Sequence, residues 1–237
     1  MKNSNFSNDP KIAVIGLGYV GLPLALEFGK KFNTIGFDIN LSRIKELENF
    51  SDSTNEAKKA DFKLASKLKF TSSVKKMQGC NIFIVTVPTP VDASKKPDLN
   101  PLEGACRSIG PHIKKDSIIV FESTVYPGCT EEFCVPLLER ESGLMLNKDF
   151  FCGYSPERIN PGDNDRGVRD IIKVTSGSNS ASASYIDWLY NNIIDAGTFR
   201  ASSIKVAEAA KVIENTQRDI NIALMNELAI IFEKMDI

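Results

Sequence analysis

The chain of 237 residues is predicted to fold as an α/β protein, with a doubly wound parallel sheet followed by one long helix. Short apolar runs rich in β-branched residues alternate with amphipathic runs, as buried parallel strands alternate with the helices that connect them. From Ser202 to Met235 the sequence has neither Gly nor Pro. This predicts a helix of about 50 Å, from the helical rise per residue. We expect a helix of that length to bridge to another domain or to a second subunit.

A glycine-rich turn after the first apolar run, Ile12–Ile15, is the strongest local signal. Its first glycine allows a tight turn, its second leaves room for a pyrophosphate, and its third lets the next helix pack on the sheet. The N-terminus of that helix offers free N–H groups and the positive end of its dipole to phosphates. The pattern is that of a Rossmann-type dinucleotide site, and the predicted contacts of this turn are Gly16, Gly18, Tyr19, Val20 and Gly21.

Asp38 ends the second predicted strand, about 20 residues past the glycines, where a carboxylate bonds the ribose 2′-hydroxyl of a dinucleotide. The same carboxylate would repel a 2′-phosphate, so the predicted cofactor is NAD rather than NADP. FAD uses the same fingerprint and remains an alternative, as does a glycine-rich turn without a ligand. Arg43 has two equally weighted interpretations, a contact to the adenine or phosphates of the cofactor and a solvated charge on a helix.

Composition favours a globular protein without a membrane segment. Hydrophobic residues make up 42% and charged residues 25%, and a net charge of −1 gives no general attraction to nucleic acid or membranes. No apolar run approaches the roughly 20 residues that span a bilayer. The polar stretch Met1–Pro10 has no signal-peptide core and is expected to be a loose leader. Five cysteines without a CxxC pair indicate reduced thiols in the cytoplasm and no metal site, and the single histidine, His112, argues against a histidine-based catalytic pair.

The remaining pattern predicts alternating strands and helices. The further strands are expected at Thr34–Asp38, Lys69–Ser72, Asn81–Val87, Ser117–Phe121, Phe150–Tyr154 and Ile171–Thr175. The helices are expected at residues 19–31, 41–48, 101–113, 127–139 and 180–192. A surface helix with loops is expected within residues 50–67, and a short helix or turn at 74–79.

Polar residues follow two of these strands, at the sheet edge that faces the ligand crevice in doubly wound folds. Thr89 lies in the Pro-rich segment after one strand, and Ser123 and Thr124 follow Glu122 after the next. We therefore expect Thr89, Ser123 and Thr124 to contact the cofactor.

Two further polar groups have both a functional and a structural interpretation. Lys211 and Asn215 are four residues apart on the long helix and share a face with Glu208, and a solvated polar face is the favoured reading of the helix alone. Glu157 and Arg158 follow Ser155-Pro156, which is equally consistent with a site and with a polar loop held by prolines.

Together these segments resemble the nucleotide-sugar 6-dehydrogenases, the family of UDP-glucose and UDP-N-acetylhexosamine dehydrogenases. The matching stretches are Gly16–Pro23, Phe37-Asp38, Val87–Pro90, Pro97–Leu99, Glu122–Thr124, Tyr154–Arg158, Ala207–Lys211, Asn215 and Asn226–Leu228. They occur in family order over nearly the whole chain.

The resemblance implies oxidation of the C6 hydroxyl of a UDP-sugar to a carboxylate with two NAD, for surface polysaccharide precursors. Lys211 and Asn215 match the residues that stabilise the oxyanion, as an ammonium and an amide donor can. Glu157 matches a participant in thioester hydrolysis or substrate positioning, and Thr124 matches the threonine that holds the reactive water. Arg158, with Glu157, Lys211 and Asn215, is implied in substrate binding. A homodimer through the long helix is implied as well.

Two departures from the family pattern refine this expectation. Pro161 stands where UDP-glucose enzymes often carry a second carboxylate, which favours the N-acetylhexosamine branch. The family's nucleophilic cysteine lies in a Gly-x-Cys-x-Gly segment that the sequence does not contain. We therefore expect an N-terminal fragment that binds NAD without completing the oxidation. Its expected parts are an NAD-binding domain at 1–200 and the start of a central helical domain at 201–237, without a UDP-binding domain. The alternatives are a β-hydroxyacid dehydrogenase of the 6-phosphogluconate type and a non-catalytic NAD-binding module.

Overall fold

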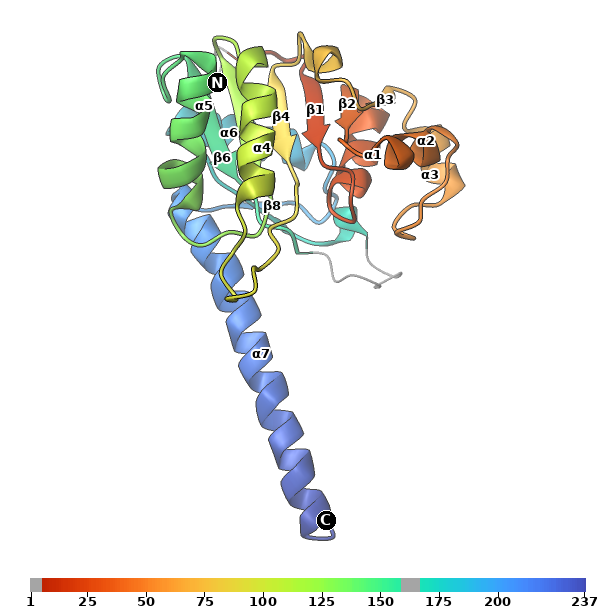
Figure 1. Cartoon of the computed structure of the whole chain (residues 1–237), viewed down its shortest axis with the longest axis vertical. Helices are drawn as coiled ribbons and strands as arrows, with labels where there is room; N and C mark the ends of the chain where they lie inside the picture. The colour runs from red at the N-terminus through yellow and green to blue at the C-terminus, as the bar shows by residue number, and fades with distance from the viewer. Residues whose placement is uncertain (1–5, 159–166) are drawn as a thin grey trace.

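A computed structural model of the chain describes residues 6–158 and 167–237, and it contains a six-stranded parallel sheet in the order β3-β2-β1-β4-β5-β6 (Figure 1). The strands are β1 (Lys11–Ile15), β2 (Asn33–Phe37), β3 (Leu68–Thr71), β4 (Ile82–Val85), β5 (Ser117–Phe121) and β6 (Phe150–Tyr154). The strand order reverses direction between β1 and β4, which pair in register from Ile12 with Ile82 to Ile15 with Val85. The predicted doubly wound parallel sheet is thus confirmed, and the reversal marks where ligands bind in such sheets.

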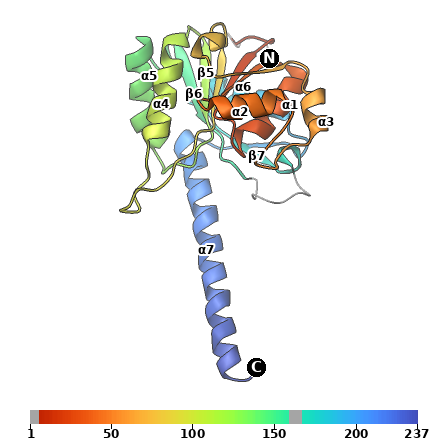
Figure 2. The ribbon, with the colours of Figure 1, turned by 45° about the vertical axis from the view of Figure 1, so that its right-hand side comes forward.

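Helices cover both faces of the sheet (Figures 1 and 2). They are α1 (Gly21–Lys31), α2 (Leu41–Glu48), α3 (Lys59–Leu64), α4 (Asn100–Ile109), α5 (Val135–Ser142), α6 (Ser180–Asn191) and α7 (Ile204–Lys234). Short 3₁₀ turns lie at Val74–Met77, Gly110–His112 and Val168–Asp170. Consecutive strand residues point to opposite faces, so Ile12 and Val14 pack with α1 and α6, whereas Ala13 and Ile15 pack with α4 and α5.

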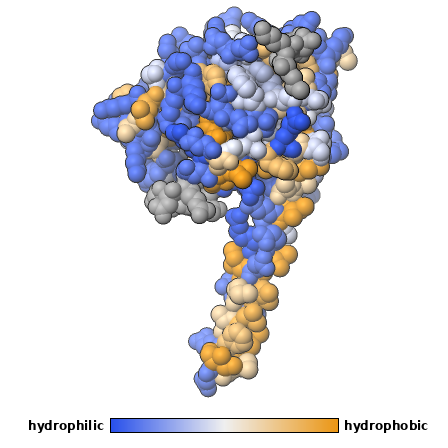
Figure 3. Space-filling view, turned by 180° about the vertical axis from the view of Figure 1, so that it is seen from behind, coloured by the Kyte–Doolittle hydropathy of each residue, from blue (hydrophilic) through white to orange (hydrophobic). Residues whose placement is uncertain are grey.

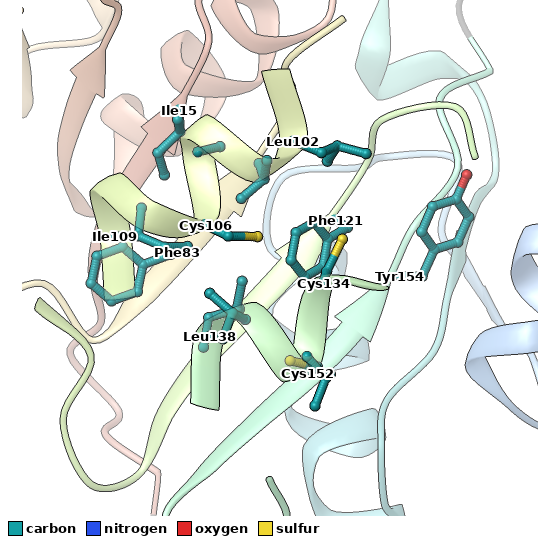
Figure 4. Close-up of a cluster of buried hydrophobic side chains, with 14 of the residues drawn as sticks. Ile15, Phe83, Leu102, Cys106, Ile109, Phe121, Cys134, Leu138, Cys152 and Tyr154 are labelled. Carbon is teal, nitrogen blue, oxygen red and sulfur yellow. The ribbon is translucent and has the colours of Figure 1, made fainter. Parts of the chain in front are cut away.

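The core between the sheet and α4 and α5 contains aliphatic, aromatic and thiol side chains (Figure 4). Phe83 and Phe121 from the strands meet Leu102 from α4 and Leu138 from α5. All five cysteines are buried free thiols, and three of them belong to the part of this core in Figure 4: Cys106, Cys134 and Cys152. Here they act as small apolar side chains. Within the described residues, no group of three or more His, Cys, Asp or Glu is placed to hold a metal ion.

The segment before β1 differs from the expected loose leader. Phe6 is buried and stacks against Phe151 and Tyr185, with ring centroids 5.1 and 5.0 Å apart. The Tyr185 hydroxyl donates to the Ser7 carbonyl at 2.6 Å. The prediction is wrong for residues 6–10 because an aromatic anchor outweighs the polar composition around it; residues 1–5 lie outside the described part.

Two predicted elements differ in detail. The strand expected at 171–175 is β7 (Lys173–Thr175), and it pairs with the unpredicted β8 (Thr198–Arg200) in a separate two-stranded sheet. The helix expected at 127–139 begins as a π-helical turn at Thr130–Cys134, before α5 runs from Val135 to Ser142. Pro136, at the start of α5, lacks the N–H that a regular α-helical turn would need there.

The long helix α7 projects from the domain (Figures 1 and 2). The Ser203 side chain caps its N-terminus by accepting the Val206 N–H at 3.2 Å. Its buried residues, Ile204, Ala207 and Glu208, all lie in the first two turns. The predicted length is confirmed, and the distal turns have no neighbour within the described chain. Among the described residues, no helix is long and apolar enough to cross a membrane.

Candidate functional site

A cleft with a volume of about 690 Å³ lies at the carboxyl ends of β1, β4 and β5, next to the reversal of strand order. Its lining combines the glycine-rich turn, the end of β2, and the loops after β4, β5 and β6. The lining residues are Gly16–Val20, Asp38, Ile39, Thr86–Pro90, Glu122–Thr124 and Glu157. The cleft therefore brings together residues that the sequence separates by more than 140 positions.

The three glycines of the turn meet different steric conditions. Gly16 has a φ of +92°, and the Thr86 hydroxyl donates to its carbonyl at 2.6 Å. A Cβ on Gly21 would lie 1.8 Å from the Gly16 carbonyl oxygen, so helix α1 can approach the turn this closely only with glycine. A Cβ on Gly18 would meet no atom within 4 Å, because Gly18 faces the open cleft. The turn therefore requires glycine at positions 16 and 21, whereas Gly18 keeps space free in the cleft.

Asp38 joins the turn to the start of α2. One carboxylate oxygen accepts the Leu17 N–H at 2.8 Å, and the other accepts the Asn40 N–H at 2.9 Å. These two bonds fix the carboxylate at the edge of the cleft. It remains able to accept a ribose hydroxyl, since each carboxylate oxygen accepts more than one hydrogen bond.

Arg43 lies behind the turn and is buried, with 8% of its surface exposed. Its Nε donates to the Leu17 carbonyl at 2.9 Å, and its guanidinium forms an ion pair with Asp52 at 2.8 Å. The interpretation as a solvated helix charge is therefore wrong. Arg43 is not among the residues that line the cleft, and its contacts brace the glycine-rich turn from outside.

The loops after β4 and β5 are tied together by hydroxyl groups. Thr89 donates to the Thr124 carbonyl and Ser123 donates to the Val87 carbonyl, both at 2.6 Å. These hydrogen bonds shape the cleft wall. Thr124 is exposed to the cleft and lies beside Glu122 and Ser123, so its side chain is available to a ligand.

A buried charged cluster stands at this end of the cleft. The Lys173 ammonium lies 2.5 Å from Glu122, 3.1 Å from the Pro156 carbonyl and 3.8 Å from Glu157. The Tyr190 hydroxyl also donates to Glu122. Burial alone would lower the pKa of Lys173, but the two carboxylates outweigh it and raise this pKa, so the ammonium stays charged. Burial, with the nearby charge of Glu157, raises the pKa of Glu122.

Sequence reasoning did not include Lys173 or Tyr190 among the site residues. The available signal for Lys173 was a single lysine within the otherwise apolar stretch Ile171–Val174, since a buried lysine needs a paired carboxylate. Tyr190 gave no distinct signal, because a tyrosine on the apolar face of a helix is ordinary core.

The first turns of α7 reach this cluster. The Lys211 ammonium donates to the Glu157 carbonyl oxygen, and burial lowers the pKa of Lys211. Arg158 pairs with Glu214 of α7 at 3.0 Å. Asn215, one turn beyond Lys211, is exposed, and none of Arg158, Lys211 and Asn215 is among the residues that line the cleft. Pro161 lies outside the described residues.

Glu208 has a different environment from its neighbours on the helix. It is fully buried, and its carboxylate accepts the N–H groups of Gly128 and Thr130 at 2.5 and 2.9 Å. The interpretation of this helix face as a solvated polar surface is wrong at Glu208, because the face is covered by the loop after β5. Glu208 thereby anchors α7 to the sheet domain.

Comparisons with known proteins place the chain in a family. Residues 10–194 match the NAD binding domain of the UDP-glucose/GDP-mannose dehydrogenase family, and residues 205–237 match its central domain. UDP-N-acetyl-D-glucosamine 6-dehydrogenase from Pseudomonas aeruginosa is 64% identical over 229 residues, which are 97% of this chain and 54% of that protein. The corresponding enzyme from Salmonella typhi is 57% identical over 97% of this chain and 54% of its own length. The chain thus spans about half the length of these curated relatives.

Solved structures give the same result. UDP-D-ManNAc dehydrogenase from Pyrococcus horikoshii superposes with a TM-score of 0.87 at 32% identity, over 95% of this chain and 55% of that one. A ternary complex of GDP-mannose dehydrogenase from Pseudomonas aeruginosa gives 0.84 at 25% identity, over 92% and 52%. The predicted cofactor, NAD, is the one that the matched domain binds, and the resemblance inferred from the motifs is confirmed. The chain belongs to the UDP-glucose/GDP-mannose dehydrogenase family.

Proposed function

We propose that this chain forms the NAD-binding half of an enzyme that oxidises the C6 hydroxyl of a UDP-sugar to a carboxylate in two hydride transfers. UDP-N-acetylglucosamine is the proposed substrate, since the relatives at 64% and 57% identity carry that activity in their names. The observation that carries the proposal is the cleft itself, which has a dinucleotide turn and Asp38 at one end and Thr124, Glu157 and the nearby Lys211 at the other. The proposed role of the uronic acid product is that of a precursor for surface polysaccharide.

The turn and Asp38 are proposed to hold NAD. The open space at Gly18 suits a pyrophosphate, the N-terminus of α1 favours its charge, and Asp38 suits the ribose 2′-hydroxyl. Tyr19 and Val20 line the same end. When bound, NAD accepts a hydride from the substrate carbon. Thr89, Ser123 and Thr124 are proposed to shape the wall beside its nicotinamide.

The charged end of the cleft is proposed to act on the sugar. Lys211 and Asn215 would stabilise the developing alkoxide, because an ammonium and an amide donor favour negative oxygen most in a site that excludes water. Glu157 would position the substrate and assist hydrolysis of a thioester, with Thr124 holding the water. Arg158 would contact the substrate next to Glu157.

The five thiols of this chain are buried in the core and none lines the described cleft. We therefore propose that the nucleophilic cysteine lies in a Gly-x-Cys-x-Gly segment outside residues 1–237, and that these residues alone bind NAD without turnover. We also propose a cytoplasmic location, because free thiols are typical of that reducing compartment. We also propose that α7 joins two copies of the protein.

The test uses the full-length protein with NAD and a panel of UDP-N-acetylglucosamine, its manno and galacto isomers, and UDP-glucose. We expect two NADH per molecule of UDP-N-acetylglucosamine and loss of at least 100-fold in kcat for Lys211→Ala, the magnitude typical for one oxyanion donor. One NADH per molecule of a small hydroxy acid would instead indicate a β-hydroxyacid dehydrogenase. NAD binding without turnover on any substrate would indicate a non-catalytic module.

A further inference from the structure

Glu157 stands in an unusual electrostatic setting. Its side chain is buried, and its neighbour Glu122, also a carboxylate, is buried with it. Among the described residues, the Lys173 ammonium lies between the two carboxylates, at 2.5 Å from Glu122 and 3.8 Å from Glu157. Two carboxylates that share one cation influence each other's protonation, since a like charge favours the neutral form and an opposite charge favours the ionised form.

The members of the cluster come from different elements and are joined by hydrogen bonds. Glu122 follows β5, Lys173 belongs to β7, and Tyr190 lies on α6. Lys173 additionally donates to the Pro156 carbonyl at 3.1 Å, which fixes the residue before Glu157. The Tyr190 hydroxyl holds Glu122 in place, and the Tyr190 ring centroid lies 5.7 Å from the Lys173 ammonium. None of these contacts requires a ligand.

We propose that Lys173 is a positioning residue for Glu157: together with Glu122 it holds the Glu157 carboxylate in place at the reacting end of the cleft. This inference rests on the function proposed above for Glu157. Lys173 acts from behind, because neither it nor Tyr190 lines the cleft. Glu122 has two effects: its carboxylate pairs with the Lys173 ammonium and so holds it in place, and a negative charge on it repels one on Glu157.

Other charged or titratable groups also face Glu157. Lys211 of α7 contacts its carbonyl, and the Arg158 N–H donates to its carboxylate at 2.6 Å. The charge of Glu157 adds to the effect of burial in raising the pKa of Tyr19 and of Glu56. The Arg158 guanidinium pairs instead with Glu214 at 3.0 Å. Among these described groups, Lys173 differs from the others because its ammonium contacts both carboxylates.

The proposal predicts pH shifts of opposite sign in the full-length enzyme. Lys173→Met removes the positive neighbour of the two buried carboxylates, so the acidic limb of the kcat profile should move to higher pH, with its apparent pKa raised by about 1 or more. Glu122→Gln removes a negative neighbour and lowers the same apparent pKa. Lys173→Arg keeps the charge and restores the wild-type profile. Lys205→Met, which removes an exposed ammonium paired with Glu132, is the matched control and leaves the profile unchanged.

A purely structural role would lower activity in both variants without opposite shifts, and that result would overturn the proposal.

A second measurement is independent of turnover and uses residues 1–237. We expect Lys173→Met to lower the melting temperature by about 10 °C at pH 8 and by less at pH 5, where a carboxylate takes up a proton. The double variant with Glu122→Gln should recover part of this loss. If the melting temperatures follow this pattern but the wild-type enzyme oxidises no UDP-sugar, the coupling of the three charges is supported and the proposed function fails. If the double variant recovers none of the lost stability, the coupling itself is contradicted.

Discussion

At the scale of single residues, two glycines of the same turn, Gly18 and Gly21, have different roles. Gly18 and Gly21 belong to one short motif, but only Gly21 has backbone atoms where a Cβ would lie. Gly18 borders the cleft. The difference follows from the geometry of the turn, in which the helix start packs onto the strand end while the middle faces the ligand.

We predict that alanine substitutions separate these roles. Gly21→Ala should destabilise the fold by about 1–3 kcal/mol, because its Cβ would overlap the Gly16 carbonyl. Gly18→Ala should leave the melting temperature almost unchanged and weaken NAD binding at least 10-fold. Calorimetric titration and thermal unfolding of both variants check this. Equal loss of stability in the two variants would contradict the assignment of Gly18 to the ligand.

The Arg43–Asp52 pair is a second residue-scale feature. Burial acts to raise the pKa of Asp52, but hydrogen bonds from Thr54 and Arg43 outweigh it and hold this pKa below its usual range. A lowered pKa in the folded state stabilises the fold above the unfolded value, about 4, and this contribution is lost as the pH falls through the folded value. The pair therefore braces the turn at neutral pH and weakens in acid.

Asp52→Asn should accordingly cost about 2 kcal/mol at pH 7, and its difference from wild type should shrink as the pH falls through the lowered pKa of Asp52. Denaturant unfolding over a pH series measures both quantities. Asp195→Asn, at an exposed ion pair with Arg169, serves as the control and should have a small effect at every pH. A pH-independent cost at Asp52 would show that packing, not charge, is responsible.

At the scale of elements, α7 depends on its first turns for attachment. Glu208 is the link, because its buried carboxylate accepts two N–H groups at the start of the π-helical turn before α5. Lys205 adds only an exposed ion pair to Glu132. The buried attachment of the helix thus consists of the two hydrogen bonds of Glu208 and the packing of Ile204 and Ala207, and the contacts of Lys211 and Glu214 add to it.

Replacing Glu208 by alanine should cost about 3 kcal/mol of folding free energy, since it leaves two buried donors unsatisfied. Amide hydrogen exchange should also become faster at Gly128 and Thr130. Glu233→Ala, near the exposed end of the same helix, is the matched control and should cost less than about 0.5 kcal/mol. Unchanged exchange in the loop would mean that Glu208 does not anchor it.

At the scale of the whole molecule, the distal part of α7 is an apolar surface that no other described residue covers (Figure 3). Ile213, Ile220, Leu224 and Ile231 are between 46% and 66% exposed, and their spacing places them on one face of the helix. A continuous apolar face of this kind marks an interaction surface.

If α7 joins two copies, as proposed, residues 1–237 should form a dimer in solution, and Leu224→Glu should convert it to a monomer. Light scattering after size-exclusion chromatography gives the mass directly. Asn226→Glu adds the same charge on the opposite side of the helix and should leave the dimer intact. A monomeric wild-type chain at concentrations near 100 µM, about the range of weak association, would argue against this surface as the dimer contact.

The sequence by itself determined the sheet, the dinucleotide turn, the carboxylate at Asp38 and the long helix. These follow from local periodicity and from glycine spacing, which act over a few residues at a time. The match of Lys211 and Glu157 to family motifs also came from the sequence, and the structure brings the two into contact.

Only the tertiary structure decided which polar residues are enclosed. A solvated charge is one sequence interpretation of Arg43 and the favoured one of the helix face with Glu208, yet both side chains are buried: Arg43 against the glycine-rich turn, and Glu208 against a loop about 80 residues away in the sequence. Lys173 belongs to the site because β7 places its ammonium between Glu122 and Glu157, which only the folded structure shows. The physical reason is that desolvation and ion pairing depend on distances between atoms in space. For residues on separate elements, the separation along the sequence does not determine those distances.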